Sequence, residues 1–91
     1  MPTEYSISQN YPNPFNSQTR IQYSVIEPVQ VQLIIYNTLG QVVTQLVNEQ
    51  KTPGVYTVNW NAGSQSLESG VYFCRVQAGE FTAVRKMLHV K

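Results

Sequence analysis

The stretch Val29-Gln30-Val31-Gln32-Leu33-Ile34-Ile35-Tyr36 alternates apolar and polar side chains over its first five residues. A period of two is typical of a β-strand that turns one face to the core and the other to water. Ile34 and Tyr36 break the alternation, which predicts that the end of this strand is covered on both sides. Pro28 precedes the stretch and, because proline cannot donate to a sheet ladder, it separates this strand from the one before it.

Strand-like segments of the same kind fill most of the chain. Thr19–Val25 also alternates, and further strands are predicted at Tyr5–Ser8, Gln41–Val47, Val55–Trp60, Val71–Ala78 and Phe81–Val90. The segment after Gly40 could be read as a helix, but Val42-Val43 and the lack of a good N-cap favour a strand. Short strands with turn signals roughly every 8–12 residues predict an all-β fold, a seven-stranded antiparallel β-sandwich of immunoglobulin-like type.

The apolar phase of each strand predicts the core. Its expected members are Ile21, Tyr23, Val31, Leu33, Trp60, Tyr72 and Val76. Trp60 is expected to anchor this core, although a single tryptophan on a β-sandwich could instead be a platform for stacking a sugar. Gly40, which suits a positive φ, and Gly79-Glu80 mark tight turns between strands.

Composition limits the class of protein. The 91 residues carry a net charge of +1 with 12% charged residues, about half the usual share, and this argues against binding to nucleic acid. No apolar run is long enough for a transmembrane helix, and Met1-Pro2-Thr3-Glu4 does not resemble a signal peptide. We expect one domain over residues 1–91, with residues 1–4 disordered or left from cloning.

Groups that could support chemistry are few. A Cys–His nucleophile pair would need Cys74 beside His89, but a thiol between Tyr72 and Val76 on an interior strand is expected to be packed and unreactive. One cysteine and one histidine cannot complete a zinc site, and the glutamates are scattered. Weak calcium binding through Asn13, Asn16 and Asn61 stays open as a minor alternative, and we predict no catalytic residue, metal or cofactor.

A proline-rich motif near the start has two interpretations. It consists of Tyr11, Pro12, Asn13, Pro14, Phe15 and Asn16. Proline fixes φ, so the motif could be a rigid lead-in whose Phe15 plugs into the end of the sandwich. The alternative is that the motif is a recognition loop. The residue types alone favour the rigid lead-in.

Short motifs follow one another in order along the chain. They are Gln9–Asn16, Thr19–Tyr23, Val31–Tyr36, Asn37–Val43, Pro53–Tyr56, Trp60-Asn61, Ser69–Phe73 and Arg85–Leu88. In this order they resemble the C-terminal sorting domains of the type IX secretion system, also called the Por secretion system, over residues 5–91. The immunoglobulin-like domain of flagellar hook-capping proteins is similar in fold.

The resemblance implies a non-catalytic address at the C-terminus of a secreted protein. It implies passage from the periplasm through the outer-membrane translocon to the cell surface or medium, and removal by a sortase-like surface peptidase. It places the signal mainly in the last strands, over Gly70–Lys91, and the N-terminal motif Tyr11–Asn16 is a separate candidate site. The sorting residues it indicates are Gly70, Val71, Tyr72, Lys86, Met87, Leu88, Val90 and Lys91. A monomer is expected.

Two other classes of function remain open. A carbohydrate-binding module would require a flat row of exposed aromatic side chains, for which the six tyrosines and one tryptophan provide material. An inert immunoglobulin-like spacer or adhesive domain of a larger extracellular protein would require no surface site.

Overall fold

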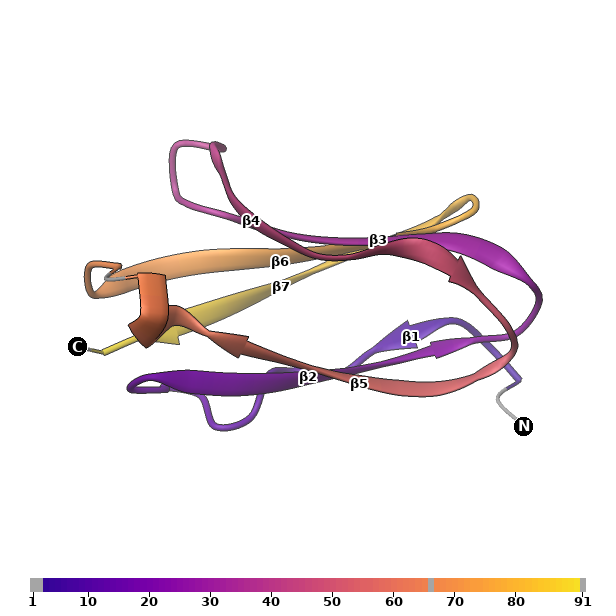
Figure 1. Ribbon diagram of the computed structural model, residues 1–91, viewed down its shortest axis with the longest axis horizontal. Helices are drawn as coiled ribbons and strands as arrows, with labels where there is room; N and C mark the ends of the chain where they lie inside the picture. The colour runs from indigo at the N-terminus through magenta and orange to yellow at the C-terminus, as the bar shows by residue number, and fades with distance from the viewer. Residues whose placement is uncertain (1–2, 66, 91) are drawn as a thin grey trace.

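The computed structural model describes residues 3–65 and 67–90. Strands follow one another along the chain, with a short 3-10 helix at Ala62–Gln65 after the fifth (Figure 1). They are β1 (Ser6–Ile7), β2 (Gln18–Val25), β3 (Val29–Tyr36), β4 (Val42–Lys51), β5 (Gly54–Asn61), β6 (Gly70–Ala78) and β7 (Phe81–His89). The 3-10 helix lies in a segment that the sequence predicts only as a loop.

The strands form two antiparallel sheets that pack face to face. One sheet has the order β1-β2-β5 and the other the order β4-β3-β6-β7, and the two appear as lower and upper layers in Figure 1. In immunoglobulin lettering these are A-B-E and C′-C-F-G, with the fourth strand beside C. The predicted seven-stranded antiparallel β-sandwich is confirmed.

Strand boundaries agree with the predictions to within one residue except at β4. β3 has the predicted bounds, whereas β4 runs on to Lys51, beyond the predicted end at Val47. The pairing of β3 with β4 shifts register twice, which leaves Leu46 and Val43 as extra residues on β4. Each bulge inverts the inside–outside phase, so no single period of two runs through this strand and its end could not be located from the pattern.

All seven predicted core residues are buried between the sheets, which confirms the expected core. Trp60 is buried near the end of β5, and its ring centroid lies 5.5 Å from that of Phe15 and 5.6 Å from that of Tyr72. Its indole N–H donates to Gln65 Oε1 at 2.7 Å, so the 3-10 helix satisfies the one polar atom of a buried indole. Trp60 is therefore the core anchor, and its burial is incompatible with a sugar-stacking role.

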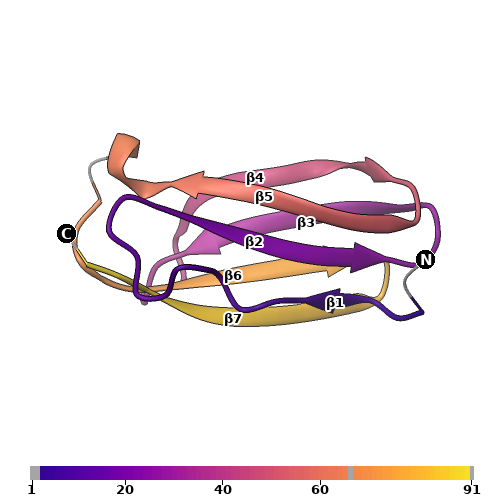
Figure 2. The same cartoon turned by 90° about the horizontal axis from the view of Figure 1, so that it is seen from below.

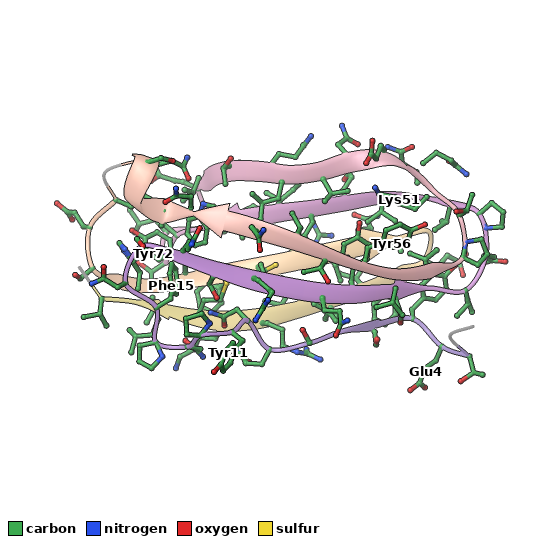
Figure 3. All side chains as sticks on the ribbon, turned by 60° about the horizontal axis from the view of Figure 1, so that its bottom comes forward. Glu4, Tyr11, Phe15, Lys51, Tyr56 and Tyr72 are labelled. Carbon is green, nitrogen blue, oxygen red and sulfur yellow. The ribbon has the colours of Figure 1, made fainter. Side chains whose placement is uncertain are left out.

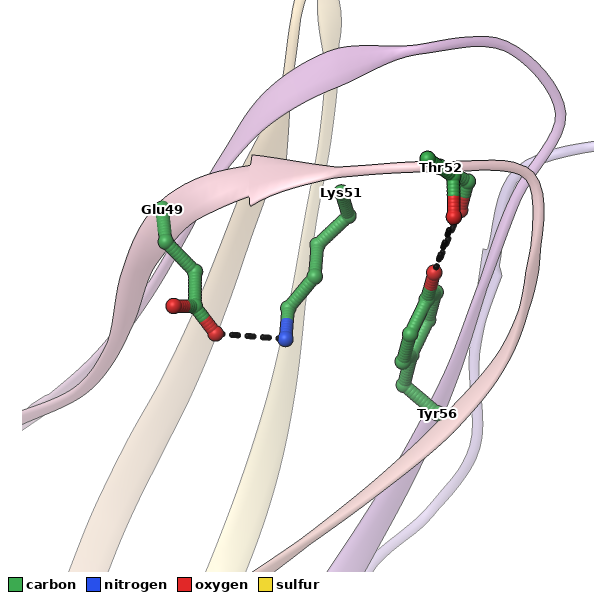
Figure 4. Close-up of polar contacts among 4 residues, drawn as sticks. All are labelled: Glu49, Lys51, Thr52 and Tyr56. Carbon is green, nitrogen blue, oxygen red and sulfur yellow. Dashed lines mark hydrogen bonds and ion pairs between the residues drawn. The ribbon is translucent and has the colours of Figure 1, made fainter.

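Two tyrosine hydroxyls tie strands to the turns before them. Tyr72 at the start of β6 donates to the Glu68 carbonyl at 2.8 Å, which is the tyrosine corner of immunoglobulin-like folds. Tyr56 on β5 donates to the Thr52 carbonyl, near the ion pair of the half-buried Lys51 and the exposed Glu49 (Figure 4). An ion pair at the surface contributes little to stability, so the hydroxyl contacts define this turn more than the charges do.

The predicted tight turns are confirmed. Gly40 has φ +79° in the β3–β4 turn, where Asn37 Oδ1 accepts hydrogen bonds from the N–H groups of Leu39 and Gln41. Gly79 has φ +61° in the β6–β7 hairpin. Both conformations are open to glycine and strained for most other residues.

Candidate functional site

The N-terminal motif meets the C-terminal motif in space. Residues 8–16, which we call the strap, begin beside β2, where Tyr11 and Arg20 exchange two backbone hydrogen bonds of 2.9 Å. The strap then crosses to the other sheet and pairs in parallel with β7: Phe15 N–H donates to the Leu88 carbonyl at 3.0 Å, and Val90 N–H donates to the Phe15 carbonyl at 2.8 Å. It thereby links the two sheets along one side of the sandwich (Figure 2).

Amide side chains add further bonds between the strap and β7. Leu88 N–H donates to Asn13 Oδ1 at 3.0 Å, and Gln9 Nε2 donates to the Lys86 carbonyl at 2.7 Å. Asn16 Nδ2 donates to the Val90 carbonyl at 3.3 Å. The outward backbone groups at the C-terminal end of β7 are therefore already paired within the chain, although β7 is the last strand of its sheet.

Phe15 fixes the strap to the core. Its side chain is 1% exposed and packs on Trp60 and on the His89 ring, 5.0 Å away between centroids. The predicted plug at the end of the sandwich is confirmed, and Figure 3 shows Phe15 beside Tyr72 at that end. Tyr11, in contrast, is 68% exposed and lies beside the Arg20 guanidinium, 5.9 Å from the ring centroid. The peptide bonds before Pro12 and Pro14 are cis.

His89 joins three parts of the fold at one buried ring. Nε2 lies 2.9 Å from the Asn16 carbonyl of the strap, and Nδ1 lies 3.1 Å from the Glu68 carbonyl in the loop before β6. A neutral imidazole donates to one of these oxygens, and an imidazolium donates to both. Both ring nitrogens face backbone oxygens, so His89 is engaged in structure and does not pair with Cys74 as a base would.

Cys74 is predicted to react very slowly with thiol reagents. It is fully buried, and burial raises the pKa of the thiol to about 12, with a smaller opposing effect from Arg85. Only the thiolate is nucleophilic, so at pH 8 we expect labelling by a disulfide reagent to be about 100-fold slower or more in the native protein than in denaturant. Equal rates in buffer and in denaturant, followed by absorbance, would show an accessible thiol.

Metal-ligand geometry is lacking in the part of the chain that the structure describes. No three His, Cys, Asp or Glu side chains lie together there. The side-chain oxygens of Asn13 and Asn61 accept hydrogen bonds from the backbone N–H groups of Leu88 and Ser64. These two proposed calcium ligands therefore already have partners. Over the same residues, no helix is long and apolar enough to cross a membrane.

The predicted sorting residues fall into two groups. Val71, Lys86 and Leu88 follow the outward phase of β6 and β7, and Val90 is exposed just beyond β7. Gly70 lies at the start of β6 in the inward phase, opposite His89. Tyr72 and Met87 are buried in the core, and Lys91 lies outside the described residues. The strap, which lies far from these strands in sequence, is the element that reasoning from the sequence did not connect to them.

The aromatic side chains do not form an exposed row. Tyr11 is the one aromatic residue among residues 3–65 and 67–90 that is mostly exposed. The others are buried or half-buried. The surface required for a carbohydrate-binding module of the predicted kind is thus not present on the described residues.

Fold and surface together define an immunoglobulin-like module that has a strapped terminal strand. A family model described as the secretion system C-terminal sorting domain matches residues 9–91, and the chain belongs to this family of type IX secretion sorting domains. The comparison with curated proteins gives no match. Membership implies interaction with the type IX machinery and export of the attached cargo to the cell surface or the extracellular space, and domains of this family are in general non-catalytic.

Proposed function

We propose that this domain is a non-catalytic sorting signal that takes an attached cargo from the periplasm through the outer-membrane type IX translocon. The observation that carries the proposal is the family match over residues 9–91, which includes all of the strap except its first residue and every strand from β2 to β7. The domain acts as a folded monomer, and a sortase-like surface peptidase removes it after passage. Its own chemistry is recognition, with no catalytic residue, metal or cofactor.

Recognition is assigned to the members of the predicted set that lie in the outward phase of their strands or just beyond β7, and the buried members support the fold. Val71, Lys86, Leu88 and Val90 offer side chains to a partner, whereas Tyr72 and Met87 hold the sheet that presents them. Side chains on rigid strands are better placed for docking than side chains on loops.

The test is a fusion of this domain behind a periplasmic reporter in a bacterium that has the type IX machinery. We expect the reporter to reach the surface or medium, and to stay in the periplasm when the domain is omitted or when the translocon is deleted. Fractionation and protease accessibility of the reporter measure the outcome. A fusion that stays in the periplasm of the competent strain would support an inert spacer in place of a signal.

A further inference from the structure

The outward face of the β4-β3-β6-β7 sheet has two unlike halves. Inward and outward side chains alternate along each strand, and the register aligns outward residues across the sheet. Gln32, Gln77 and Thr82 align in one row near the β6–β7 hairpin, with Gln30 beyond them. Toward the other end the rows are mainly apolar. Those rows contain Val42, Tyr36, Phe73 and Lys86, then Gln45, Ile34, Arg75 and Val84.

The apolar half, continued along the end of β7, carries half of the exposed large hydrophobic side chains of the described residues. Of the eight large hydrophobic side chains that are exposed, four belong to this face or continue its outward phase beyond β7: Val42, Val84, Leu88 and Val90. A fifth, Leu39, is 80% exposed in the adjoining β3–β4 turn and lines a hollow of about 380 Å³ together with Val71. Contiguous exposed apolar surface of this kind marks interaction sites.

Ile34 and Tyr36 on β3 add to the apolar surface of this face. The sequence predicts that the end of β3 is covered on both sides, and the structure contradicts this for the chain by itself: both side chains lie on the outward face and stay half-exposed. Apolar residues on both faces of a strand are typical of a sheet with cover on both faces. The missing cover is expected to come from outside the domain.

The charges on this face all have one sign. Arg75 and Lys86 are its charged residues and lie as diagonal neighbours on β6 and β7. Neither belongs to an ion pair; among the described residues the ion pair found is Lys51 with Glu49. Arg75 instead donates to Gln77 Oε1 at 3.4 Å. Two cations without a carboxylate, set in apolar surface, do not stabilise the isolated domain and are suited to a partner that supplies carboxylates.

We propose that this docking face, formed by Ile34, Tyr36, Phe73, Arg75, Val84 and Lys86, binds an apolar protein surface that carries carboxylates opposite the two cations. The inference rests on the proposed sorting function and identifies its partner as the machinery component that receives the domain. Two cations are too few for an anionic bilayer, which is bound through clusters of about 4–8. A second copy paired face to face would place like charges against each other.

The experiment uses charge reversal on the docking face in the reporter fusion. We expect Arg75→Glu with Lys86→Glu to lower the exported fraction by about tenfold or more, because like charges at an interface are strongly unfavourable. Arg75→Gln with Lys86→Gln should lower it only about threefold. The single variant Arg75→Glu is matched by Arg20→Glu, the same arginine-to-glutamate change on the outward face of the other sheet, which should export like the parent.

The outcomes separate the inference from the function on which it rests. If the parent fusion is exported and the double charge reversal is exported equally well, the docking face is wrong and the sorting function stands. If the parent fusion is not exported, both the sorting function and the docking face are wrong. Binding of the purified domain to phosphatidylglycerol vesicles that is lost in the double variant would assign the face to lipid and overturn the protein partner. Equal melting temperatures of all variants show that the loss is not unfolding.

Discussion

Phe15→Ala is expected to lower the free energy of unfolding by about 3–5 kcal/mol. The side chain is almost fully buried and packs on Trp60 and His89, so its removal leaves a cavity between the sheets. The same residue makes the two backbone bonds that join the strap to β7, and these lose their anchor when the ring is absent. A domain of this size has a total stability of roughly 5–15 kcal/mol, so a large part would be lost.

Urea unfolding followed by the fluorescence of the single tryptophan, Trp60, measures this loss. Tyr11→Ala is the matched control, because it removes an aromatic ring from the same strap at a position that is mostly exposed. We expect the control to change stability by about 0.5 kcal/mol or less. Similar midpoints for the two variants would mean that the strap is not fixed through Phe15.

Local alternation was sufficient to predict the sandwich and its core. The sequence predicts β3 with its observed bounds because the inward residues Val31, Leu33 and Ile35 keep one phase along the strand. The bounds of β4 do not follow from its pattern, because two bulges on β4 shift its inside–outside phase relative to β3. A bulge is defined by how two strands pair, so its position cannot be predicted from the pattern of one strand alone.

The strap shows a second limit of reasoning from the sequence. Both terminal motifs were identified, but as separate elements, because the bonds between them join residues more than 70 positions apart. The amides of Asn13 and Asn16 looked like possible calcium ligands and instead bond to Leu88 and Val90. An asparagine beside a proline is typical of many loops, and which backbone group it meets is decided by the tertiary fold.

Deletion of Met87–Lys91 is expected to unfold the domain. Met87 is fully buried, and Met→Ala substitutions in a core alone cost about 2–5 kcal/mol. The deletion also removes the buried His89 with its contacts to Asn16 and Glu68, and it removes the Leu88 and Val90 partners of Phe15. Together these losses are comparable with the whole stability of a small domain.

This expectation decides how a sorting defect in the truncated chain is to be interpreted. Circular dichroism and thermal unfolding of the purified truncated domain should show no cooperative transition, whereas Leu88→Asn with Val90→Asn, which changes only exposed side chains, should keep one. If the double variant Leu88→Asn with Val90→Asn folds but is exported less, the exposed side chains at the end of β7 take part in recognition. If the truncated chain keeps a native transition and only loses export, the terminal segment is a separable signal, and the strap is not needed to hold it.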